Sequence, residues 1–121
     1  MSHPIVHIEL SAKDHKAAGK FYSSVFGWEL QEFPEMNYTT FASGKDAVGG
    51  GFNPLSKEYP AGTVMVYIHT DDLDASIEKI KANGGELVTG RYEIPTVGDM
   101  ATFKDPTGNL MALLQPVEGG M

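Results

Sequence analysis

The sequence predicts an α+β domain built from two tandem β-α-β-β-β modules that share one curved mixed sheet with a cleft. Two observations predict this fold class. Short apolar or alternating runs flank two runs with helical spacing. The order of these runs returns at an offset of about 58 positions, which is long enough for a supersecondary unit. We therefore place one module at residues 1–53, a Pro- and Gly-containing linker at 54–62, and the second module at 63–116.

The first module begins with a β-branched run at residues 4–10, which is typical of a strand. Residues 11–26 carry apolar side chains at helical spacing, with Asp14 as a candidate N-cap. Gly27 is expected to end this helix in the left-handed conformation of a C-cap. Three further strands are predicted from alternation and turn residues, at 28–33, 37–42 and 47–52.

The second module repeats this order. A helix is predicted at residues 71–82, with Leu73, Ile77 and Ile80 on one face and Asp71 or Asp72 at its start. The glycines after Asn83 end that helix. The four strands of this module are expected at residues 63–69, 86–93, 99–104 and 109–115.

Composition limits the possible partners. Hydrophobic residues make up 41% of the chain and charged residues 21%, so a disordered chain is excluded. The absence of cysteine excludes disulfides and thiolate chemistry. A net charge of -7 makes nucleic acid and anionic membranes poor partners. No signal peptide or membrane-spanning stretch is recognisable, so we expect a cytoplasmic location.

Four motifs, in their order along the chain, resemble the vicinal oxygen chelate superfamily, which includes glyoxalase I, bleomycin resistance proteins and extradiol dioxygenases. They are His7 on the first strand, the aromatic run at residues 21–28, the helix and its glycine stop at 72–85, and the turn at 103–109. The resemblance implies paired modules, a small-molecule ligand and assembly as a homodimer.

The resemblance also implies a divalent metal held by His and Glu side chains from the first and last strand of each module. His7 matches one of these four positions, whereas the other three hold glycine at 49–51, Met65 and Ala112. Glycine and alanine supply no side-chain donor to a metal. We therefore expect no cofactor, and a divalent metal is disfavoured.

Strand geometry brings other polar groups together. His7 and Glu9 share one face of the first strand, and Met65, Tyr67 and His69 share one face of the matching strand in the second module. We expect these strands to be neighbours, so that the side chains line the bottom of the cleft. His7 and Glu9 are candidate catalytic residues, because a His beside a carboxylate is suited to acid–base work. The simplest alternative is that they form a satisfied buried pair, and a further alternative is a variant metal site with His69.

The remaining candidates are assigned to ligand binding. Trp28 and Gly50 join Met65, Tyr67 and His69 in this set. Glycines in a strand mark a bend, a bulge or a place where a ligand approaches the backbone closely. His3 and His15 are expected to be surface histidines.

The function predicted from these observations is the binding of a small, partly apolar molecule in the cleft, without the usual metal tetrad. That molecule is expected to place a polar or anionic group near His7. The alternative is a metal-dependent lyase, isomerase or dioxygenase that uses His7 with non-standard ligands such as Glu9 or His69. A third possibility is an interaction module without chemistry, so the sequence leaves open whether the protein is an enzyme.

Overall fold

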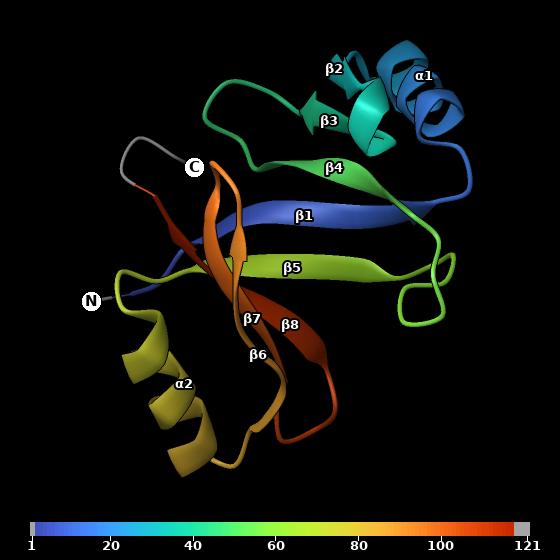
Figure 1. Ribbon diagram of the computed structural model, residues 1–121. Coiled ribbons are helices and arrows are strands. Elements are labelled where there is room, and N and C mark those ends of the chain that lie inside the picture. Colours follow the sequence, from blue (N-terminus) through green and yellow to red (C-terminus); the bar gives the residue numbers. More distant parts are fainter. Residues whose placement is uncertain (1, 118–121) are drawn as a thin grey trace. The chain divides into compact units, whose positions relative to one another are not determined.

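A computed structural model describes residues 2–117 of the 121-residue chain (Figure 1). The element order is β-α-β-β-β followed by β-α-β-β-β, as the sequence predicts. The elements are β1 (Ile5–Ala12), α1 (His15–Phe26), β2 (Glu29–Phe33), the 3-10 turn η1 (Pro34–Met36), β3 (Tyr38–Ala42), β4 (Gly49–Pro54), β5 (Val64–His69), α2 (Leu73–Ala82), β6 (Glu86–Ile94), β7 (Gly98–Lys104) and β8 (Leu110–Pro116). Within residues 2–117, no helix is long and apolar enough to cross a membrane.

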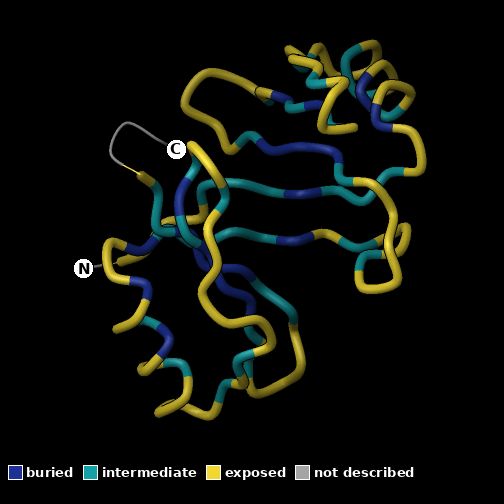
Figure 2. Tube along the Cα trace, viewed as in Figure 1, coloured by how far each residue is buried: buried dark blue, intermediate teal, exposed yellow. Residues whose placement is uncertain are grey.

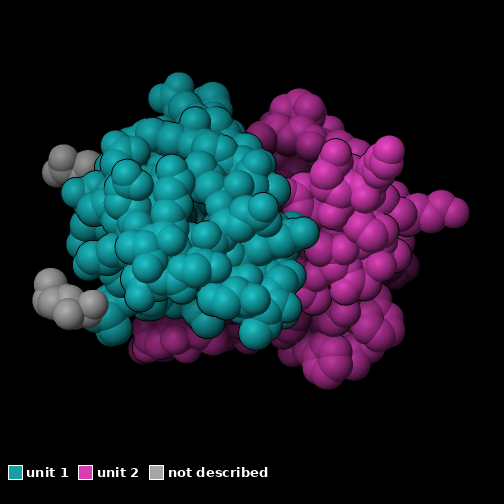
Figure 3. Space-filling view, turned by 90° about the horizontal axis from the view of Figure 1, so that it is seen from below, with its two compact units in different colours: residues 1–6, 66–121 teal, residues 7–65 magenta. Residues whose placement is uncertain are grey.

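The chain divides into two compact units, coloured separately in Figure 3. The N-terminal unit comprises residues 7–65, and the C-terminal unit comprises the described parts of 1–6 and 66–121. Each unit holds one helix and four strands, apart from short strand ends that belong to the other unit.

The N-terminal unit is a four-stranded sheet in the order β2-β3-β4-β1. Strand β1 runs parallel to β4 with Glu9 opposite Gly51, and β3 runs antiparallel to both of its neighbours. Helix α1 covers one face, where Phe52 of β4 stacks on Tyr22 of the helix. Because side chains alternate along a strand, Glu9 and Gly51 lie on the opposite face.

Helix α1 begins later than the helical spacing predicts. Ser11 and Ala12 continue β1 and pair with β4, so the helix starts at His15. The side chain of Asp14 caps it by accepting hydrogen bonds from the backbone N–H groups of Lys16 and Ala17. The C-cap at Gly27 is confirmed, with a left-handed φ of 74°.

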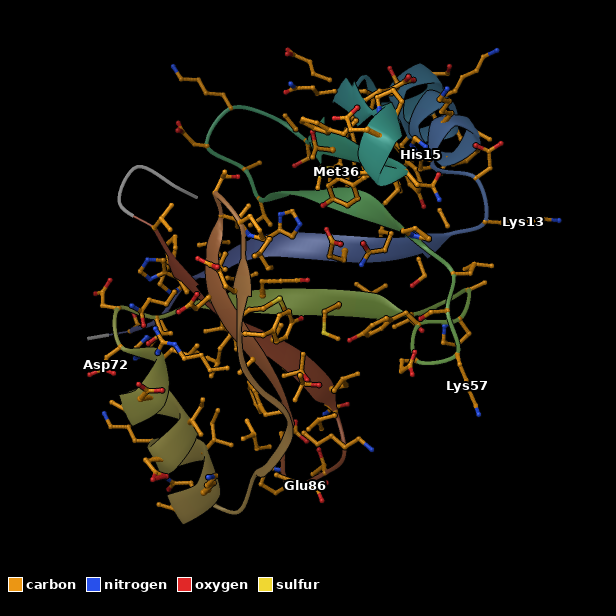
Figure 4. All side chains as sticks on the ribbon, in the orientation of Figure 1. Lys13, His15, Met36, Lys57, Asp72 and Glu86 are labelled. Atoms are coloured by element: carbon orange, nitrogen blue, oxygen red, sulfur yellow. The ribbon has the colours of Figure 1, made fainter. Side chains whose placement is uncertain are left out.

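His15 is buried, and the prediction of a surface histidine is wrong at this position. Its side chain lies at the first turn of α1 (Figure 4) and is 7% exposed. Its Nδ1 forms a 2.5 Å hydrogen bond with the hydroxyl of Thr39, a buried β3 residue on the helix side of the sheet. The hydrogen bond satisfies both buried polar groups, which explains why a histidine is tolerated there.

The C-terminal unit is a sheet in the order β5-β8-β7-β6, covered by α2. Its core consists of Leu73 and Ile77 from the helix and Ala101 and Leu113 from the sheet, and the buried segments of α2 are visible in Figure 2. Asp72 is the residue that caps α2, since its carboxylate accepts from the N–H of Ala75 at 3.0 Å.

The turn between β7 and β8 is organised by Asp105. Its carboxylate accepts hydrogen bonds from the side-chain amide and backbone N–H of Asn109 and from both donors of Thr107. These bonds, led by the Asn109 side chain, lower the pKa of Asp105 below its usual range. The carboxylate therefore stabilises the turn at neutral pH, and this contribution falls as acid protonates it.

Candidate functional site

A cluster of three hydrogen-bonded polar side chains lies on the face of the N-terminal sheet opposite α1. His7 and Glu9, two residues apart on β1, both point to this face. His7 Nε2 lies 2.5 Å from Glu9 Oε2, and their side chains are 13% and 6% exposed. The predicted pair thus exists as a close, largely buried contact within one strand.

Tyr38 is the third member of this cluster, and the sequence reasoning missed it. Its hydroxyl donates a hydrogen bond to Glu9 Oε2 and lies 3.2 Å from His7 Nε2. Tyr38 belongs to β3, so its ring must pass over the intervening strand β4 to reach β1. It does so above Gly51, where a Cβ atom would collide with the Tyr38 ring and hydroxyl.

The other two glycines of β4 also sit where the backbone is approached closely. A Cβ on Gly50 would collide with the carbonyl oxygen of Ile8, and one on Gly49 would lie 2.7 Å from the carbonyl oxygen of Phe41. The protein's own atoms therefore occupy the space that a side chain would need at all three positions. A run of glycines in a strand was a signal for such an approach, but only the strand register identifies Tyr38 as its partner.

The short contacts of the cluster meet at one oxygen, Oε2 of Glu9. A carboxylate accepts hydrogen bonds and does not donate them, so with Glu9 as a carboxylate and His7 in the Nε2–H tautomer both the imidazole and the Tyr38 hydroxyl donate to Oε2. Charge-assisted hydrogen bonds of this kind are stronger than neutral ones. Glu9 thus holds the imidazole and the phenol in fixed orientations.

Two of the predicted ligand-binding residues, Trp28 and Gly50, lie on the α1 side of the N-terminal sheet, opposite the cluster. Trp28 stacks on Tyr22 and Phe41 with centroid distances of 4.9 and 4.4 Å, so it belongs to the aromatic core under α1. Gly50 faces the same side as Phe41, which a Cβ at that position would crowd. These two residues have packing roles on the face opposite His7.

The candidates on β5 are divided between the units. Met65 is 4% exposed and belongs to the N-terminal unit. Tyr67 and His69 belong to the C-terminal unit, where Tyr67 pairs with Ala112 of β8. His69 lies just before α2, with Nε2 3.8 Å from Asp71, and its carbonyl is hydrogen-bonded to His3.

A hollow of about 650 Å³ lies beside the start of α1 in the N-terminal unit. The carboxylate of Asp14 already accepts from the N–H groups at this helix end. An anion would meet that negative charge, so the hollow is a poor anion site despite the neighbouring lysines. Its lining residues are Lys13, Asp14, His15, Lys16, Pro34 and Asn37.

The side chains do not fit the metal site that the fold family implies. His7 Nε2 is bonded to Glu9, and the Tyr38 phenol takes the space where a ligand from position 51 would begin. Ala112, at the corresponding position of β8, supplies no donor. Within residues 2–117, no group of three or more His, Cys, Asp or Glu side chains could hold a metal ion.

Comparison with known proteins identifies the family. Residues 4–113 match the model of the Glyoxalase/Bleomycin resistance protein/Dioxygenase superfamily, so the chain belongs to this superfamily. A glyoxylase-like domain-containing protein of Didymella fabae is 34% identical over 113 residues, which cover 88% of each chain. This is the superfamily that the sequence motifs resemble.

Two further relatives are longer than this chain. CFP32 of Mycobacterium bovis is 31% identical over 115 residues, and the anthracycline biosynthesis protein DnrV of Streptomyces peucetius is 29% identical over 121. These matches cover 89% and 87% of this chain but 44% of either relative. The chain therefore spans less than half the length of these relatives.

Solved structures show the same fold. A superfamily member from Vibrio splendidus 12B01 has a TM-score of 0.67 at 18% identity and covers 94% of this chain and 99% of its own. Methylmalonyl-CoA epimerase from Mycobacterium tuberculosis has a TM-score of 0.70 at 16% identity, with coverages of 93% and 87%. The α+β fold with two β-α-β-β-β modules is thereby confirmed.

Proposed function

We propose that the protein binds a small, partly apolar molecule at the cluster of His7, Glu9 and Tyr38, without the family's metal tetrad. The observation that carries this proposal is the hydrogen-bonded cluster itself. Packing of the sheet does not need polar side chains here, because apolar side chains of similar volume at buried positions often give a fold that is as stable or more stable. The cluster therefore supports a role in recognition.

The cluster also has the groups needed for metal-free acid–base chemistry. An imidazole oriented by a carboxylate is a common arrangement for proton transfer, and a phenol beside it is a second proton carrier. In this proposal His7 exchanges the proton and Glu9 orients the ring. A metal-dependent lyase, isomerase or dioxygenase is the less favoured alternative, because His7 and Tyr38 are engaged with Glu9.

A thermal-shift screen tests the proposed site. We expect some small aromatic compounds to raise the Tm of the wild-type protein but not that of His7→Ala or Glu9→Gln, because these changes break the cluster. Compounds that stabilise all three proteins equally would place the ligand elsewhere. Stoichiometric binding of a divalent ion that His7→Ala abolishes would favour the metal-dependent alternative.

We also propose that the protein forms a homodimer. Helix α1 exposes three large apolar side chains, Phe21, Val25 and Phe26, each more than half exposed. Exposed apolar patches of this kind are typical of interaction surfaces. We expect sedimentation to give a dimer for the wild type and a monomer for Phe26→Ser. A monomer at every wild-type concentration would contradict the proposal. The cytoplasmic location and the lack of nucleic-acid or membrane partners stay predictions.

A further inference from the structure

We infer that the ligand presents a hydrogen-bond donor, an ammonium or a hydroxyl group, to the carboxylate of Glu9. This inference rests on the proposed function and specifies the class of molecule that the cluster recognises. It departs from the anionic group that the sequence leads one to expect beside His7. The observation behind it is the unequal use of the two oxygens of Glu9.

Both hydrogen bonds to Glu9 are made by the same oxygen, Oε2. Among residues 2–117, no partner is present for the other oxygen, Oε1. The only fully buried side-chain oxygen or nitrogen without a partner in that range is Thr102 Oγ1. Oε1 therefore keeps access to solvent, although the Glu9 residue as a whole is only 5% exposed.

An acceptor in this position has a strong requirement for a donor. A carboxylate oxygen in a largely buried side chain reaches solvent over only a small area, so few water molecules can hydrate it. An incoming ammonium or hydroxyl group would satisfy it with a charge-assisted hydrogen bond. A carboxylate ligand has no hydrogen to donate and would meet the charge of Glu9 at close range.

The other two members of the cluster do not reverse this preference. The Nε2 hydrogen of His7 and the hydroxyl hydrogen of Tyr38 are both directed to Oε2, so an anion could use them only by breaking those bonds. The net charge of -7 also attracts cationic ligands and repels anionic ones at long range. The chemistry of the cluster thus points to a donor, with a cation preferred over a neutral hydroxyl.

Three probes carry the same phenyl ring and differ in their polar group: benzylamine, benzyl alcohol and benzoate. Comparing their affinities shows which polar group the cluster prefers. Binding is measured at neutral pH and millimolar probe concentration, by ligand-observed NMR and by the shifts of the His7 and Tyr38 resonances. We expect benzylamine to bind most tightly, benzyl alcohol more weakly and benzoate not at all. The order of the three affinities for the wild-type protein tests the inference even if a variant fails to fold.

The variant Glu9→Gln removes the charge with little change in shape. We expect it to weaken benzylamine binding about 10- to 100-fold, the range for a lost hydrogen bond to a charged group. The matched control is Glu32→Gln on β2, an exposed carboxylate outside the cluster, which should leave binding unchanged. Thermal unfolding of each variant reports whether the fold is kept.

The outcomes distinguish this inference from the proposed function. Benzoate that binds as well as or better than benzylamine, and shifts the His7 resonances, overturns the donor class but leaves the proposed site standing. Benzylamine that binds equally to wild type and Glu9→Gln overturns the role of Glu9. If no probe shifts the His7 or Tyr38 resonances, both the inference and the proposed site are rejected.

Discussion

Replacing Gly50 by alanine is expected to destabilise the protein by at least about 4 kcal/mol, which is exceptional for adding one methyl group. The added Cβ would collide with the backbone carbonyl oxygen of Ile8 on the neighbouring strand and crowd the ring of Phe41. A backbone oxygen in a parallel strand pair cannot turn away without breaking the pairing of β1 and β4. Chemical denaturation followed by circular dichroism measures the loss.

The matched control is Gly90→Ala on β6. Gly90 is also a strand glycine, but a Cβ there would meet nothing within 4 Å. This control is expected to be neutral or slightly stabilising, because alanine has less conformational entropy to lose than glycine. If Gly50→Ala were as stable as Gly90→Ala, the close approach of β1 and β4 at this position would be wrong.

Replacing Gly51 by alanine is expected to cost about 1–3 kcal/mol, the usual range for overpacking. Here the obstacle is the ring and hydroxyl of Tyr38, a side chain that is able to rotate away. The substitution should therefore expel Tyr38 from its hydrogen bond to Glu9 without unfolding the sheet. Denaturation gives the cost, and the NMR shifts of the Tyr38 ring report its displacement.

A double-mutant cycle separates this effect from a general intolerance of β4 to side chains. In a Tyr38→Ala background the obstacle is absent, so Gly51→Ala should cost much less than in the wild type. The same background should not rescue Gly50→Ala, because its obstacle is backbone. Equal costs of Gly51→Ala in both backgrounds would show that Tyr38 does not lie over position 51.

Most of the fold was readable from the sequence because its signals are local. The apolar spacing of α2, the left-handed glycine after α1 and the capping aspartates each depend on a few neighbouring residues. The start of α1 was predicted four residues too early, since pairing of Ser11 and Ala12 with β4 is a long-range contact. Element boundaries are thus decided by partners that lie far away in sequence.

The candidate site was only half readable for the same reason. His7 and Glu9 are two residues apart on one strand, so their shared face follows from strand geometry alone. Tyr38 is 31 residues from His7, and its contact with the cluster depends on the register of three strands and on a glycine beneath its ring. The sequence by itself determined the superfamily, the fold class and the close pair on β1. Only the tertiary structure decided that Tyr38 completes the cluster, because register and side-chain reach arise from contacts across the sheet.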